Sequence, residues 1–153
     1  QLAHVASAQG IIAACAAAGA PCETKVNIVP ACVYTSPEIA SIGFTEAEAK
    51  AAGVTVQVGK FSLAANSKSI ITQQGRSFAK IVVDAENNRI IGAQIMCGRA
   101  TDMIGELGLA ISSKLTVDQF ARLMRPHPTF EEALGEAAQS LLGGAIHARP
   151  LRK

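Results

Sequence analysis

The feature that most constrains the fold is the segment SFAKIVVDAENNRIIGAQIMC, residues 77–97. Its two halves are rich in valine and isoleucine, which favour strands, and the polar residues Asp84 to Asn88 between them are typical of a turn. This order predicts a β-hairpin. The stretch VTVQVGKF alternates Val54, Val56 and Val58 with polar residues, so it predicts a strand with one buried face.

Helical patterns precede and follow these strands. Residues 2–18 are rich in alanine, and the Gly19 and Pro21 that follow them are residues that stop helices. Capping-box patterns, in which a threonine is followed three residues later by Glu or Gln, predict the starts of two short helices at Thr45–Glu48 and Thr116–Gln119.

Two further helices complete the pattern. Residues 102–115 carry apolar side chains along one helical face, and residues 130–142 do so without interruption until Gly143. Because the strands are grouped together and are followed by helices, the sequence predicts an α+β fold, with helices packed on an antiparallel β-sheet. We expect a helix at residues 1–19, a linker at 20–28 and the sheet-containing domain at 29–153.

Composition excludes several classes of function. Charged residues make up 17% of the 153 residues, below the average of about 25%, so the lightly charged surface favours burial against a partner. The net charge of +2 and the 4% of aromatic residues argue against nucleic-acid binding. No apolar run approaches the ~20 residues of a membrane span.

Metal and nucleotide motifs are also missing. The four cysteines contain no CxxC pair and are expected to be free thiols of a cytoplasmic protein. The three histidines lie far apart in the sequence, so no metal site is expected. Neither GxGxxG after a strand nor GxxxxGK[ST] is present, so we expect the chain by itself to bind no nucleotide.

The stretch MRPHPTFEEALGEAA, residues 124–138, has two interpretations. In the first, Thr129 and Glu132 form a capping box that starts the last helix. In the second, the prolines on both sides of His127 fix the backbone of a general base, and Glu132 stabilises its protonated ring. The local sequence leaves both interpretations open.

HPTFEEALGEAA resembles the His-Pro-Thr-x-x-Glu signature of the flavin-dependent pyridine nucleotide–disulfide oxidoreductases. VYTSPEIASIGFTEAEAKAAG is similar to the start of that family's dimerisation domain, and DAENNRIIGAQIMCGRATDMIGELGLAI to its central hairpin and long helix. QLAHVASAQG is similar to the stretch where a helix meets the flavin. Within the family, the dihydrolipoamide dehydrogenases are the most similar members.

The resemblance implies roles for individual residues. His127 matches the catalytic base, Glu132 matches its orienting partner, and the bond from His127 to Pro128 is expected to be cis. Leu2, Ala3 and His4 match the backbone that meets the flavin, where a helix N-terminus stabilises negative charge. The family's histidine acts on the other subunit, which implies a homodimer.

The chain departs from the family in two respects. Arg125 stands where many dihydrolipoamide dehydrogenases have a second histidine, and the Cys-x4-Cys disulfide and the FAD and NAD segments are missing. Since the chain also starts at Gln1 without methionine, we expect it to be part of a longer enzyme and to be inactive as this fragment. The resemblance implies that the full-length enzyme uses FAD and NAD. It also implies that the enzyme serves the lipoyl-bearing domain of a 2-oxo acid dehydrogenase complex. The alternatives are a dimerisation or binding module without catalysis, and another disulfide reductase such as glutathione reductase.

Overall fold

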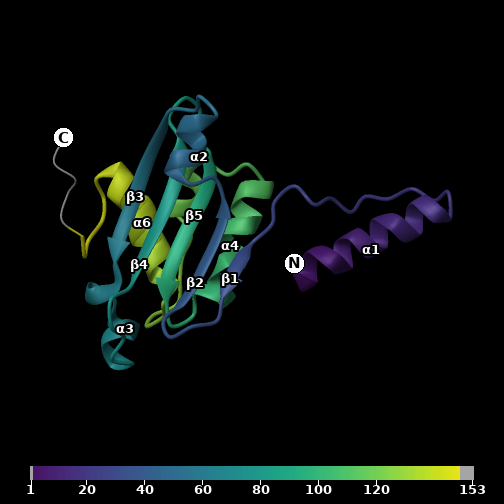
Figure 1. Cartoon of the computed structure of the whole chain (residues 1–153). Helices are drawn as coiled ribbons and strands as arrows, with labels where there is room; N and C mark the ends of the chain where they lie inside the picture. The colour runs from purple at the N-terminus through teal and green to yellow at the C-terminus, as the bar shows by residue number, and fades with distance from the viewer. Residues whose placement is uncertain (1, 149–153) are drawn as a thin grey trace.

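A five-stranded antiparallel sheet forms the centre of the molecule (Figure 1). The computed structural model describes residues 2–148. The strands run in the spatial order β1-β2-β5-β4-β3. Their bounds are β1 (Ala31–Val33), β2 (Glu38–Gly43), β3 (Val56–Ser62), β4 (Phe78–Asp84) and β5 (Ile90–Cys97). The α+β class is confirmed, and the predicted hairpin is the β4–β5 pair.

Two helices cover one face of the sheet. α4 lies over β2 and β5, and α6 lies over β3 and β4, with α5 packed beside α6. The helix bounds are α1 (Ala3–Ala17), α2 (Glu46–Ala51), α3 (Ser67–Ile71), α4 (Ala100–Ser112), α5 (Val117–Ala121) and α6 (Glu132–Leu142), with a 3-10 turn at Leu63–Ala65. None of these helices is both long enough and apolar enough to cross a membrane, within the described residues.

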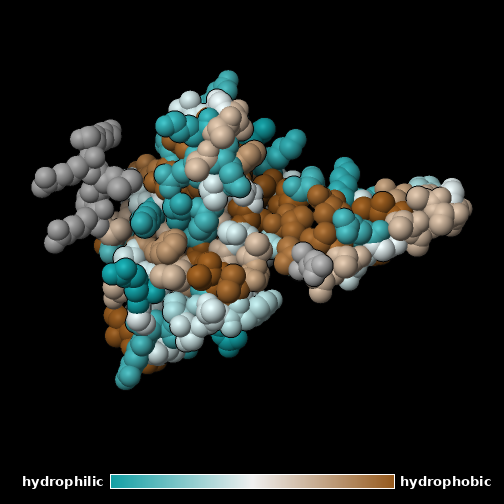
Figure 2. All heavy atoms as spheres, viewed as in Figure 1, coloured by the Kyte–Doolittle hydropathy of each residue, from teal (hydrophilic) through white to brown (hydrophobic). Residues whose placement is uncertain are grey.

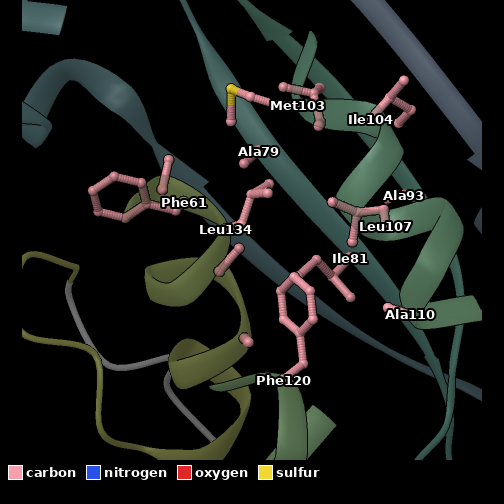
Figure 3. Packing of buried hydrophobic residues seen from close by; sticks show 14 of the residues in the cluster. Phe61, Ala79, Ile81, Ala93, Met103, Ile104, Leu107, Ala110, Phe120 and Leu134 are labelled. Carbon is pink, nitrogen blue, oxygen red and sulfur yellow. The ribbon is translucent and has the colours of Figure 1, made fainter. Parts of the chain in front are cut away.

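The core lies between this helical layer and the sheet. Figure 3 shows Leu107 of α4, Phe120 of α5 and Leu134 of α6 gathered over Ile81 and its strand neighbours, and all of these side chains are fully buried. The alternation of side chains along a strand explains which residues take part, since Ala79, Ile81 and Val83 share one face of β4.

The contact between α6 and β3 depends on a glycine. A Cβ atom at Gly59 of β3 would meet the backbone carbonyl oxygen of Ala137 of α6 well inside van der Waals distance. Leu141 of α6 lies over the same position. The missing side chain therefore lets the helix backbone approach the strand, and this approach sets the height of α6 above the sheet.

The other face of the sheet carries a row of apolar side chains. Val33, Ile39, Met96 and Phe78 are paired across four neighbouring strands. Val33 is 50% exposed and Ile39 is 42% exposed. Side chains of this kind on an open sheet face favour contact with another surface.

Helix α1 extends away from the sheet and buries none of its residues (Figure 1). Tan and brown residues cover much of its surface in the space-filling view (Figure 2). The His4 ring of this helix contacts the rest of the chain, with its Nε2 donating to the Pro30 carbonyl oxygen at 2.9 Å. The helix ends at Ala17 with Ala18 as its C-cap, and Gly19, at φ +61°, follows at the stop that the sequence predicts.

Two details differ from the sequence prediction. The α-helical part of α6 begins at Glu132 and not at Phe130, because the bonds from the Ala133 N–H to the Phe130 carbonyl and from the Leu134 N–H to the Glu131 carbonyl close a tighter turn first. The 3-10 turn and α3, which lie between β3 and β4, were not predicted.

Candidate active site

Four segments of the chain, one of them the residues that follow α6, form a hollow of about 180 Å³ around the predicted catalytic residues. The connection between β3 and β4 forms one wall, the segment that joins α5 to α6 forms another, and the first turns of α6 form the floor. Its polar lining comprises Asn66, Ser67, Arg125, His127, Glu132, Glu136 and His147.

His127 and Glu132 are in direct contact. The His127 Nδ1 lies 2.8 Å from the Glu132 Oε1, and the peptide bond between His127 and Pro128 is cis, as the resemblance implies. The imidazole is 67% exposed, whereas the Glu132 side chain is 28% exposed. The carboxylate therefore lies beneath a ring that stays accessible from outside.

The capping-box prediction for this helix start is only half right. The Thr129 N–H donates to the Glu132 Oε2 at 2.8 Å, which is one of the two bonds of a box. The Thr129 hydroxyl does not cap the helix; it donates to the Pro126 carbonyl oxygen at 2.8 Å. Glu132 thus fixes the loop with one oxygen and holds the imidazole with the other.

Two other threonines show what a complete box looks like in this chain. Thr45 with Glu48, and Thr116 with Gln119, each make both reciprocal bonds, as predicted. Neither of these threonines follows a histidine-proline pair. The different geometry at Thr129 therefore belongs to the loop that carries His127.

The environment of Glu132 keeps its carboxyl group ionised. Partial burial on its own raises the pKa of Glu132, but the hydrogen bonds from the Thr129 N–H and the His127 ring outweigh this effect, and the pKa is lowered. At neutral pH a carboxylate therefore faces the imidazole. Such a carboxylate selects the tautomer with a proton on Nδ1 and stabilises the imidazolium.

Arg125 holds the loop from its interior side. Its guanidinium Nη2 lies 2.6 Å from the Glu106 Oε1 of α4, and its side chain is only 8% exposed. The guanidinium carbon lies 4.6 Å from the centre of the Phe120 ring. This residue, which departs from the family pattern, fixes the backbone two positions before His127.

A second histidine–glutamate pair, which the sequence did not predict, lines the same hollow. The His147 Nδ1 lies 3.0 Å from the Glu136 Oε1, and the His147 N–H donates to the Glu136 Oε2 at 3.0 Å. Glu132 and Glu136 are four residues apart, so they lie on one face of α6. That spacing was the available sequence signal, but it does not reveal where His147 lies.

The predicted flavin contact residues lie at the start of α1, beside a separate hollow of about 600 Å³. Leu2 is the N-cap residue and makes no side-chain cap, and the first turn contains no acidic residue. The N–H groups of this turn can therefore face a negatively charged group, which fits one edge of a flavin. Leu2 and Ala3 line this hollow, whereas the His4 ring contacts Pro30. None of these three predicted residues lines the hollow that contains His127.

Metal binding has no support in the described part of the chain. Within residues 2–148, no group of three or more His, Cys, Asp or Glu side chains is arranged to hold a metal ion.

Comparison with known proteins gives consistent results. Residues 29–138 match the family described as pyridine nucleotide-disulphide oxidoreductase, dimerisation domain. The chain is 45% identical over 148 residues to a dihydrolipoyl dehydrogenase of Bacillus subtilis, with 96% of the chain and 31% of that protein covered. It is 42% identical over 146 residues to the dihydrolipoyl dehydrogenase of Haloferax volcanii, with 95% and 31% covered.

Solved structures agree with this match. The crystal structure of LpdA from Mycobacterium tuberculosis aligns with a TM-score of 0.82 and 28% identity, over 92% of this chain and 31% of that one. The flavoprotein disulfide reductase RclA from Escherichia coli shares the fold. It aligns with a TM-score of 0.71 and 24% identity, over 74% of this chain and 26% of RclA. The chain thus spans about a third of the length of the relatives that it matches.

Proposed function

Since the chain belongs to the family of pyridine nucleotide-disulphide oxidoreductase dimerisation domains, we propose that it is part of a dihydrolipoyl dehydrogenase, in which His127 is the acid–base group and Glu132 orients it. The observation that carries the proposal is the 2.8 Å contact between the His127 Nδ1 and the Glu132 Oε1 at the edge of an open hollow. The reaction would oxidise dihydrolipoamide and reduce NAD⁺.

The chemistry of the pair follows from its geometry. With the Nδ1 proton donated to Glu132, the lone pair of the neutral ring lies on Nε2, which makes no hydrogen bond to a described residue. This nitrogen can take a proton from a substrate thiol and leave a thiolate, the nucleophilic form of sulfur. The charge of Glu132 then stabilises the imidazolium, and the proton returns from Nε2 in the reverse direction.

The remaining parts of the active site would come from other segments. FAD and the redox-active cysteines would supply the two-electron chemistry when bound, and NAD⁺ would accept the electrons. In this arrangement residues 1–19 complete the flavin domain, with Leu2, Ala3 and His4 at the ring, 20–28 form a linker, and 29–153 form the dimerisation domain. His127 would serve the partner subunit of a homodimer, and a lipoyl-bearing domain would deliver the substrate.

The decisive experiment compares turnover of the full-length enzyme with and without the imidazole. We expect His127→Ala to lower turnover with dihydrolipoamide by about 10²- to 10⁴-fold, the usual contribution of a positioned general base. Glu132→Gln keeps the shape of the side chain and one capping acceptor, so it should lose less activity than His127→Ala, but clearly more than its stability loss explains.

Bound FAD, followed by its absorbance, and the dimer mass are the controls, and both variants should retain them. Full turnover in a folded His127→Ala enzyme would contradict the proposal. It would leave the stretch from Arg125 to Glu132 as a helix start without a catalytic role.

A further inference from the structure

Asn66 joins the candidate active site to a part of the chain 63 residues away. It follows the 3-10 turn Leu63–Ala65 and caps α3, and it lines the same hollow as His127 and Glu132. Only 4% of its surface is exposed. A buried primary amide is costly unless its polar atoms have partners, so its contacts define what it does.

Both ends of the Asn66 amide have partners, and these partners fix its orientation. The Oδ1 accepts hydrogen bonds from the Ser69 N–H at 2.9 Å and from the Ser69 hydroxyl at 3.1 Å. Because a peptide N–H can only donate, this end must be the carbonyl oxygen. The NH₂ group therefore faces the Thr129 carbonyl oxygen, to which it donates at 2.9 Å.

Thr129 connects this contact to the histidine. Its own N–H donates to the Glu132 Oε2 at 2.8 Å, while its carbonyl accepts from Asn66. The two bonds hold the peptide groups on either side of the Thr129 Cα, so together they restrict both of its backbone dihedrals. These dihedrals set the direction of the His127–Pro128 segment relative to the start of α6.

We propose that Asn66 is a positioning residue for the His127–Glu132 pair: its NH₂ group holds the Thr129 carbonyl and thereby keeps the imidazole over the carboxylate. A general base needs such a fixed direction, because small misplacements of reacting groups cost turnover. The effect on turnover rests on the function proposed above, whereas the effect on the geometry of the pair does not.

Three variants separate this role from the capping of α3. Asn66→Asp keeps an oxygen that caps α3 but replaces the NH₂ donor with an acceptor. Asn66→Ser keeps a capping hydroxyl and is too short to reach Thr129, so it provides a second test if the aspartate variant folds poorly. Ser69→Ala is the matched control, because it removes a bond on the α3 side and leaves the bond from Asn66 to Thr129 in place.

The first measurement uses the 153-residue chain. Nitrogen-15 NMR of the neutral His127 ring reports which nitrogen carries the proton, and hydrogen exchange reports the protection of the Thr129 amide. The Nδ1–H tautomer should dominate in the original chain and in Ser69→Ala. Both Asn66 variants should mix the two tautomers and exchange the Thr129 amide about tenfold faster, the effect of losing one hydrogen bond. An unchanged tautomer and unchanged exchange in both would overturn the proposal.

The second measurement uses the full-length enzyme. Asn66→Asp and Asn66→Ser should lower kcat about 10- to 100-fold and leave the KM for NAD⁺ unchanged, while Ser69→Ala keeps both. If His127→Ala is inactive but both Asn66 variants have full kcat, Asn66 has no positioning role in catalysis. If His127→Ala itself is fully active, the proposed function fails, and the NMR result still decides whether Asn66 positions the pair.

Discussion

Glu132 uses each of its two carboxylate oxygens for a different contact. One accepts from the loop N–H of Thr129 and the other meets the His127 ring, both at 2.8 Å. Stabilising the start of α6 and orienting the imidazole are therefore compatible roles for this residue. The contact that shapes the loop also lowers the pKa of the carboxyl group that faces the imidazole, although partial burial opposes this shift.

From the lowered pKa of Glu132 we predict how the free energy of unfolding changes at acidic pH. A carboxyl group whose pKa is lower in the folded than in the unfolded state stabilises the fold above its unfolded pKa of about 4.3, and this contribution is lost as the pH falls through the folded value. The free energy of unfolding should therefore fall less steeply below about pH 5 in Glu132→Gln than in the original chain. Urea unfolding between about pH 3 and pH 7 measures this slope.

Glu131→Gln provides the charge control for that experiment. It removes one negative charge from the neighbouring position without touching the contacts of Glu132. If both variants flatten the slope equally, the effect comes from net charge and not from the bonds to Thr129 and His127.

The resemblance to the family predicted which two residues meet, but not what surrounds them. His127 and Glu132 are close in the chain and lie at a helix start, a local pattern that is compatible with their contact but does not require it. Asn66 and His147 reach the hollow through tertiary packing, which no local pattern encodes. Arg125 appeared only as a departure from the family pattern, and its contact with Glu106 depends on how α4 packs.

At the scale of elements, the predicted helices and strands were recovered where their signals were strong. Alternating valines, the Asp84–Asn88 turn and two complete capping boxes each specify local geometry, and β3, the β4–β5 hairpin, α2 and α5 formed as expected. The start of α6 was misplaced because the Thr129 hydroxyl bonds to Pro126 instead of capping the helix. The α3 segment was missed because five residues are too short to show a helical period.

The packing of α6 on β3 gives a prediction at this scale. Gly59→Ala adds a methyl group against the Ala137 carbonyl and should destabilise the protein by about 1–3 kcal/mol, the usual cost of overpacking. Gly105→Ala in α4 is the matched control, since apart from the adjacent residues and backbone of its own helix no atom lies within 4 Å of the added carbon. This control should stabilise by about 0.5–1 kcal/mol, because alanine favours helices.

Thermal or urea unfolding of both glycine variants checks this contrast. Equal stability of Gly59→Ala and the original chain would mean that α6 can shift away from the sheet without cost. Since Glu132 and Glu136 both belong to α6, such a shift would also move the floor of the hollow.

At the scale of the whole molecule, exposed apolar surface indicates contact with other surfaces. The row of Val33, Ile39, Met96 and Phe78 lies on the face of the sheet opposite α4 and α6. Leu142 at the end of α6 is 44% exposed. These observations, together with membership of a family of dimerisation domains, support association with a second copy.

We expect the chain to self-associate through α6 and the surrounding sheet, burying about 2,000 Å² or more, as obligate dimers do. Light scattering at high protein concentration measures the mass. Leu142→Glu should weaken the association, whereas Leu109→Glu, at a 66% exposed position of α4, serves as the control. A strictly monomeric chain would contradict this expectation and would indicate that other segments of the proposed full-length enzyme supply most of the dimer contact.

The strand order also predicts the sequence in which the strands form during folding. β3, β4 and β5 are consecutive in the chain and adjacent in the sheet. β2, in contrast, pairs with β5, and a long stretch of chain separates these two strands. Closing that loop costs entropy before its contacts are gained, so we expect the β4–β5 hairpin to form before β2 docks. Ile81→Val in β4 should therefore slow folding, while Ile42→Val in β2 should mainly speed unfolding. Both isoleucines are buried. Stopped-flow folding and unfolding rates of the two variants would show whether β4 or β2 joins the sheet last.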